Sequence, residues 1–195
     1  MLYKRILSVD HGTTRGYSLL TVTDDKKVKK EESGFIYFSK DSTCEDFYED
    51  YKDIIERLKP DTLVLEKVNV YGKSFGGNNV IRLAEIRSML KLLANQNGLI
   101  IDEVNPTSVK KFMTGHGNAS KLQVASAVCK KFNMRTLDIP KIRTKNPQFD
   151  VCDSLGNGLF AICRKINNGN MPDGVYFDVL VDKNNLEVEE KHIRI

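Results

Sequence analysis

The chain has 195 residues, of which 41% are apolar and 29% charged, and a formal net charge of +4. This composition is typical of an ordinary folded domain and excludes disordered and fibrous proteins. No apolar run approaches the ~20 residues of a membrane-spanning helix, and the run after Arg5 stops at Asp10, which is too short for a signal peptide. The four cysteines lack C-x-x-C spacing, so we expect reduced, mostly buried thiols in a cytoplasmic protein.

Three short strands are predicted near the N-terminus. Residues 5–9, 16–23 and 33–38 are rich in Ile, Val, Leu, Tyr and Phe, and glycine or polar turns separate them, including the run 24–32. Because no helix intervenes, we expect an antiparallel three-stranded meander. Asp10 directly follows the first of these strands.

A helix and a fourth strand are predicted next. Apolar residues recur at helical spacing from Phe47 to Leu58, and Pro60 closes this helix. The apolar run 62–65 then ends at Glu66. A helical connection of this length normally makes the following strand parallel to a neighbour. Asp10 and Glu66 should therefore both lie at strand ends.

A long helix over residues 80–96 follows a loop, 71–79, that contains three glycines. Its apolar stripe consists of Val80, Leu83, Ala84, Ile86, Leu90 and Leu93. Ile81, Met89 and Leu92 widen this surface beyond what one sheet face needs. The pattern indicates either a second partner, such as a dimer mate, or a fully buried helix.

The segment from Thr107 to Pro147 is strongly basic. It has nine Lys or Arg residues and one acid, Asp138. The net charge of this segment is therefore +8, compared with +4 for the whole chain. It follows a predicted strand over 99–104 and includes predicted helices near 107–113 and 120–132. Clustered basic charge is typical of a surface that binds a phosphate backbone, but a solvated helix face has the same composition.

The last core helix is predicted over residues 149–166 and carries two acids. At 100° per residue, Asp150 and Asp153 lie 60° apart. The face of the helix that carries these two acids also includes Asn157, Ala161 and Arg164. The apolar stripe of the helix consists of Leu155, Leu159, Ile162 and Ile166. Because this apolar stripe lies nearly opposite, we expect the acid pair to point toward a cleft or solvent.

The C-terminal segment is predicted to be an addition to a completed domain. A polar linker is followed by a β-hairpin pattern over residues 175–181 and 186–189. We therefore expect a domain over 1–166 and an extension over 167–195.

Four carboxylates begin or end apolar elements in this pattern: Asp10, Glu66, Asp150 and Asp153. Hard cations such as Mg²⁺ prefer carboxylate oxygens and water. Two such ions about 3.5–4 Å apart can stabilise both the attacking and the leaving oxygen of a phosphodiester. The arrangement predicts a metal-dependent nuclease.

The element order and four sequence stretches resemble the RuvC-type Holliday-junction resolvases of the ribonuclease H-like superfamily. The stretches are Ile6–Tyr17, Leu63–Glu66, Gly115–Lys121 and Asn146–Leu155. In that family the first acid ends strand one, the second ends strand four, and an acid pair opens the last helix. The resemblance implies an α/β fold with a mixed five-stranded sheet flanked by helices.

The same resemblance implies an endodeoxyribonuclease that resolves four-way junctions by paired symmetric nicks. The implied cofactor is Mg²⁺, with Mn²⁺ able to substitute, and the implied ligands are the four acids. The implied partners are branched DNA and a second copy of the chain, with no membrane.

The resemblance also implies DNA-binding residues. Lys110 and Lys121 match positions that contact DNA near the scissile phosphate, and Lys111 and Arg143 lie in the same basic segment. Ser120 is expected to cap the helix that carries Lys121. Where family members often place an aromatic wedge, this chain has Asn69. Tyr71 or Phe75 is expected to substitute by stacking on an unpaired base.

Three alternatives remain open from the sequence. A nuclease of the same fold could act on flaps, forks or other branched DNA. The stretch Asp10-x-Gly12-Thr13-Thr14 also resembles the phosphate-binding turn of actin-like kinases and ATPases, which need two such domains. A structural DNA-binding module without catalysis is the third, and the complete acid set argues against it.

Overall fold

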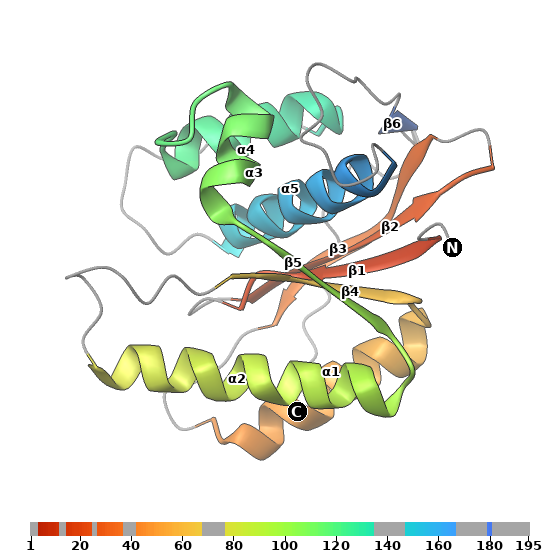
Figure 1. Ribbon diagram of the computed structural model, residues 1–195, viewed down its shortest axis with the longest axis vertical. Helices are drawn as coiled ribbons and strands as arrows, with labels where there is room; N and C mark the ends of the chain where they lie inside the picture. The colour runs from red at the N-terminus through yellow and green to blue at the C-terminus, as the bar shows by residue number, and fades with distance from the viewer. Residues whose placement is uncertain are drawn as a thin grey trace.

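The computed structural model describes residues 4–11, 15–24, 27–36, 42–67, 77–134, 147–166 and 179–180. Helices cover both faces of one sheet (Figure 1). One face is covered by α1 (Cys44–Leu58) and α2 (Gly77–Gln96). The opposite face is covered by α3 (Pro106–Thr114), α4 (Lys121–Lys131) and α5 (Pro147–Ile166).

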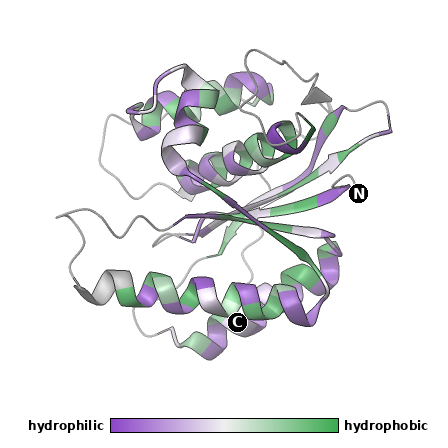
Figure 2. Cartoon of the chain, in the orientation of Figure 1, coloured by the Kyte–Doolittle hydropathy of each residue, from purple (hydrophilic) through white to green (hydrophobic). Residues whose placement is uncertain are grey.

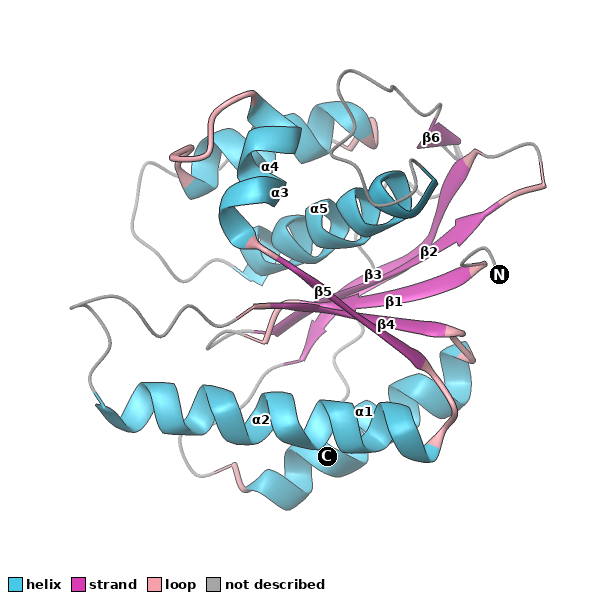
Figure 3. Cartoon of the chain, viewed as in Figure 1, coloured by secondary structure: helices cyan, strands magenta, loops and turns pink. Residues whose placement is uncertain are grey.

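The sheet is mixed, with the strand order β5-β4-β1-β2-β3-β6 (Figure 3). An antiparallel meander is formed by β1 (Arg5–Val9), β2 (Arg15–Val22) and β3 (Val28–Ile36). The parallel strands are β4 (Thr62–Glu66), which pairs with β1, and β5 (Ile100–Val104), which pairs with β4. This architecture confirms the predicted five-stranded sheet and its flanking helices.

The predicted turn over residues 24–32 is wrong over most of its length, because β3 already begins at Val28. Its polar residues pair with β2 in antiparallel register, and the Thr21 hydroxyl donates to Glu31 at 2.9 Å. Lys29 and Glu31 also form an ion pair at 3.2 Å. Polar residues fit this strand because its side chains are half-exposed there, so hydrophobicity alone cannot identify it.

A sixth strand of two residues, β6 (Val179–Leu180), pairs parallel with Val28 and Lys29 of β3. The rest of the predicted linker and hairpin lies outside the described residues. The hairpin and the domain boundary at residue 166 therefore remain predictions.

The sheet separates two hydrophobic clusters. Alternate residues of β1 and β4 point to opposite faces, so Ile6 and Val64 join α3, α4 and α5, whereas Leu7 and Leu63 join α1 and α2. Apolar residues accordingly dominate the central strands in Figure 2, while polar and apolar residues alternate along α2. Each face of the sheet therefore has its own core.

Helix α5 is far more buried than its single predicted stripe suggests. From Val151 to Cys163, every residue except Asp153 is buried, because the helix packs on the sheet and also against α3 and α4. Of the two alternatives predicted for the acid pair, a cleft or solvent, the solvent alternative is therefore wrong for Asp150, which is only 9% exposed.

The cysteines agree with the prediction of reduced and mostly buried thiols. None of the four forms a disulfide, and only Cys44 is exposed. Cys129 on α4 and Cys152 on α5 lie side by side with their sulfurs 3.9 Å apart. They help to join α4 to α5 through a buried contact.

Helix α2 is not fully buried. Ile86, Leu90 and Leu93 face the sheet, whereas Ile81 and Leu92 are 59% and 52% exposed. The buried-helix alternative is thereby excluded, and the outer face of α2 presents apolar side chains to solvent. Within the described parts of the chain, neither α2 nor any other helix is long and apolar enough to cross a membrane.

Candidate active site

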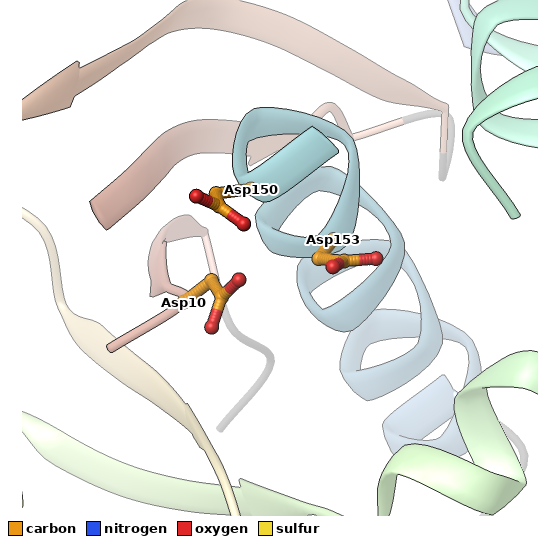
Figure 4. A group of neighbouring side chains, drawn as sticks. All are labelled: Asp10, Asp150 and Asp153. Atoms are coloured by element: carbon orange, nitrogen blue, oxygen red, sulfur yellow. The ribbon is translucent and has the colours of Figure 1, made fainter. Parts of the chain in front are cut away.

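The predicted acids come together where β1 and β4 end. These two strands are parallel neighbours with Val9 opposite Leu65, so the following residues, Asp10 and Glu66, reach the same edge of the sheet. The first turns of α5 lie against this edge and supply Asp150 and Asp153 (Figure 4). Three elements far apart in sequence thus contribute acids to one place.

Three of the four acids are within reach of one ion. Carboxylate oxygens of Asp10, Asp150 and Asp153 all lie within 4.8 Å of one another. Glu66 does not belong to this compact set, but it is close enough for its charge to raise the pKa of Asp10. The acid cluster, meaning these four residues, therefore has a compact centre and one neighbouring carboxylate.

Gly16 allows α5 to approach this closely. The backbone N–H of Asp10 donates to the Gly16 carbonyl at 2.9 Å, which closes the turn between β1 and β2. A β-carbon at Gly16 would lie 2.1 Å from the carbonyl carbon and oxygen of Asp150. Only a residue without a side chain at position 16 permits this contact between the start of β2 and α5.

Lys121 is the cation that contacts the acid cluster most directly. Its Nζ lies 3.3 Å from Asp150 Oδ1 and 3.5 Å from Asp153 Oδ2. Ser120 caps α4, as predicted, and forms a capping box with Gln123 that fixes the start of the helix. The cap thereby directs Lys121 toward the two aspartates.

Burial and like charge both disfavour ionisation of these acids. Burial raises the pKa of Asp10, and the charges of Asp153, Glu66 and Asp150 raise it further. Burial also raises the pKa of Asp150 to about 6, although Lys121 opposes this shift. The pKa values of Asp153 and Glu66 are raised chiefly by burial. The four carboxylates outnumber the two lysines whose charges oppose these shifts, Lys121 and Lys110, so an all-oxygen cluster of this kind fits a hard divalent cation.

We expect the stability of the metal-free protein to fall as pH rises from about 4 through about 6. The folded acids retain protons that the unfolded chain releases near its ordinary pKa, so the folded state binds more protons over this range. Bound Mg²⁺ would replace those protons, and the increase in Tm that it causes should therefore grow with pH. Thermal scans with and without Mg²⁺ across this range measure the effect.

Asp150→Asn is the control for this pH dependence, because an amide at this position does not titrate. The variant should show a shallower fall in stability with pH and a smaller Mg²⁺ effect than the parent. A Mg²⁺-induced change in Tm that is equal at every pH would contradict the assignment.

The predicted DNA-binding residues are only partly described. Lys110 on α3 lies near enough to the cluster for its charge to oppose the rise in the pKa of Glu66 and Asp153, and Lys111 is exposed. Tyr71, Phe75 and Arg143 fall outside the described residues, as does Asn69.

Two buried polar residues beside the acids were not predicted as site residues. His11 is 5% exposed, and burial, together with the charges of Arg87 and Arg15, lowers its pKa to about 4. Asn157 is 2% exposed and lies four residues after Asp153. Its i+4 position was a usable signal, because such a residue shares the helix face of the acid.

The family profile described as "Crossover junction endodeoxyribonuclease RuvC" matches residues 6–156, which is more than half of the chain. The chain belongs to the RuvC family. The RuvC protein of Fusobacterium nucleatum is 27% identical over 180 residues, 87% of this chain and 92% of that protein. The RuvC protein of Prochlorococcus marinus is 30% identical over 142 residues, 70% of this chain and 86% of that protein.

Solved structures of RuvC proteins share the fold. Thermus thermophilus RuvC in complex with a Holliday junction substrate superposes with a TM-score of 0.64 at 16% identity, covering 85% of this chain and 97% of that one. The fowlpox virus Holliday junction resolvase superposes with a TM-score of 0.53 at 19% identity, covering 81% of this chain and 97% of that one. At these identities the superpositions establish the RuvC-like fold alone.

Proposed function

We propose that this chain is a metal-dependent crossover junction endodeoxyribonuclease that resolves four-way DNA junctions by paired symmetric nicks. The observation that carries the proposal is the acid cluster: the carboxylates of Asp10, which follows β1, and of Asp150 and Asp153 on α5 lie within 4.8 Å of one another in a chain of the RuvC family. Relatives spanning most of the chain are named crossover junction endodeoxyribonuclease. None of the described helices is long and apolar enough to span a membrane, and the cysteines form no disulfide. Both observations are compatible with the proposed action on DNA in the cytoplasm.

Asp10, Glu66, Asp150 and Asp153 would hold one or two Mg²⁺ ions, for which Mn²⁺ could substitute. When bound, the metal supplies a polarised water and stabilises charge on the oxygens of the phosphodiester. The carboxylates provide the negative charge that keeps divalent cations beside a phosphate. Lys121, which contacts Asp150 and Asp153, would balance part of that charge before DNA arrives and would bind the phosphate afterwards.

The DNA would approach over α3 and α4. Lys110 and Lys121 face the acid cluster, and Lys111, Lys130 and Lys131 extend positive charge along the two helices. Arg143 belongs to the same basic segment. We propose that Tyr71 or Phe75 stacks on an unpaired base where other family members use the residue at position 69.

Replacing Lys110 and Lys121 together by Ala should weaken junction binding and make it less sensitive to salt. Each lysine that neutralises a phosphate releases condensed counterions, so the loss of two should flatten the salt dependence of the affinity by roughly two ion equivalents. Fluorescence anisotropy over a salt series measures this slope. Lys52→Ala on α1, the other side of the sheet, is the matched control. A double variant that binds like the parent at every salt concentration would show that the DNA path lies elsewhere.

We propose that the chain acts as a homodimer through the outer face of α2. A junction presents two strands of like polarity for symmetric cleavage, and two active sites related by a two-fold axis fit it. Ile81 and Leu92 are eleven residues apart, which places them within about 20° of each other on α2. Their exposed apolar side chains lie on the helix face opposite the buried residues Ile86 and Leu90.

Replacing Leu92 by Glu should convert the dimer to a monomer at micromolar concentration while keeping the fold. A charge buried in an apolar interface destabilises the assembly, whereas at this position it is solvated in the monomer. Light scattering gives the mass, and circular dichroism checks the fold. A parent protein that is monomeric both free and bound to a junction would refute the dimer.

Cleavage of synthetic DNA tests the function directly. Matched substrates would be a four-way junction, a fork and a flap with shared arm sequences, each with and without Mg²⁺. Symmetric nicks in the junction that require Mg²⁺ support the proposal. Faster cleavage of flaps or forks would instead assign the same chemistry to other branched DNA.

A further inference from the structure

Asn157 is a buried polar side chain that the fold itself does not use. It lies in the interior of α5 and is 2% exposed. Its amide nitrogen, Nδ2, has no hydrogen-bond partner within the part of the chain that the structure describes. Burying an amide donor without a partner destabilises a folded protein, so an apolar residue would serve packing better at this position.

The position of Asn157 on the helix points it toward the acid cluster. At 100° per residue, Asn157 lies about 20° from Asp150 and about 40° from Asp153 on the helix surface. At 1.5 Å per residue it stands about 6 Å further along the axis than Asp153. Asn157 therefore continues the face of α5 that presents the two aspartates.

The carboxylate that faces Asn157 is Glu66 of β4. Asn157 is near enough to favour the ionised form of Glu66, although its Nδ2 completes no hydrogen bond of normal geometry. Glu66 also has no ion pair within the described residues, in contrast to Asp150 and Asp153, which both contact Lys121. The α5 side chain that favours the ionised form of Glu66 is thus the neutral amide of Asn157.

We infer that Asn157 is a positioning residue, which donates a hydrogen bond from Nδ2 to one oxygen of Glu66 and leaves the other oxygen for the metal. The inference rests on the proposed function, because it assumes that Glu66 is a metal ligand. An amide suits this role because it can donate to a carboxylate without adding a fifth negative charge to the cluster. Hydrogen bonds of this kind to ligating carboxylates orient them and strengthen metal binding.

Asn157→Leu separates this role from a structural one, because the two roles predict opposite changes. Leucine has a similar volume and removes the unpaired amide, so the metal-free protein should gain about 2–4 °C in Tm. The same change removes the donor to Glu66, so Mn²⁺ affinity should fall about tenfold or more. A purely structural asparagine would lose stability on replacement and leave metal affinity unchanged.

The experiment is calorimetric titration of the full chain with Mn²⁺, together with thermal unfolding in the absence of metal. Ser154→Ala is the matched control, because this buried α5 hydroxyl already donates to the Val151 carbonyl at 2.8 Å and should not alter Mn²⁺ binding. Asn157→Ala provides a second variant, which should also lose about tenfold in Mn²⁺ affinity.

Weaker Mn²⁺ binding by both Asn157 variants, with unchanged binding by Ser154→Ala, supports the inference. If the parent binds Mn²⁺ and either folded Asn157 variant binds it equally well, Asn157 does not position Glu66 and the proposed function stands. If the parent itself binds no Mn²⁺, the proposed function and this inference both fail.

Discussion

Asp10→Asn should reduce the rate of junction cleavage at saturating Mg²⁺ by at least about 10²–10³-fold. The change keeps the shape of the side chain but removes one of the three carboxylates that lie within 4.8 Å of one another. Because burial and three neighbouring acids disfavour the charge of Asp10, the metal-free variant should be at least as stable as the parent. Single-turnover cleavage of a four-way junction measures the loss.

Asp53→Asn is the matched control, because Asp53 is an exposed acid on α1, on the other face of the sheet. This variant should cleave at the parental rate. The Asp10 variant should still bind junctions, since it removes negative charge that faces the phosphate. Near-parental cleavage by Asp10→Asn would mean that the acid cluster is not the catalytic site.

Gly16→Ala should be the most disruptive small substitution near the site. The added methyl group would lie 2.1 Å from the Asp150 carbonyl and 2.4 Å from the Val151 nitrogen, and both are backbone atoms that cannot turn aside. Such overpacking should lower the free energy of unfolding by about 3 kcal/mol. It should also displace the start of α5, so that Mn²⁺ affinity falls with stability. Chemical denaturation and calorimetry measure the two effects.

Gly156→Ala tests whether the effect of Gly16 is specific to its position. Gly156 lies within α5, where the nearest atoms to an added β-carbon would be side-chain atoms of Val109, Val128 and Met113 at 3.6–3.7 Å, an ordinary contact distance. Alanine is also the better helix former, so this variant should gain about 0.5–1 kcal/mol. Equal losses of stability from the two substitutions would contradict the close contact between Gly16 and α5.

The convergence of the acids was predictable because it follows from strand direction. Once β1 and β4 are parallel neighbours, Asp10 and Glu66 must emerge at the same edge of the sheet. The capping role of Ser120 was predictable for a similar reason, since it depends only on residues within one helical turn. Local patterns and chain direction were sufficient for both.

The features that the sequence did not predict depend on packing between distant elements. Asp150 is buried at a place where Gly16 of β2 and Lys121 of α4 both approach it, and the apolar pattern of α5 does not specify these contacts. The start of β3 at Val28 depends on pairing with β2 rather than on hydrophobicity. The i+4 spacing places Asn157 on the face of Asp153, but the burial of its amide near Glu66 depends on how α5 packs against β4.

The wide separation of the acids along the chain has a consequence for how the enzyme is made. Asp10 and Glu66 leave the ribosome early, but half of the acid cluster lies on α5, which also carries much of the core on its side of the sheet. A growing chain can form the β1–β2–β3 hairpins locally, yet it must close loops of about a hundred residues to complete the site. We therefore expect a partly synthesised chain that lacks α5 neither to bind metal nor to cut DNA, and nuclease activity to appear only after α5 has been made.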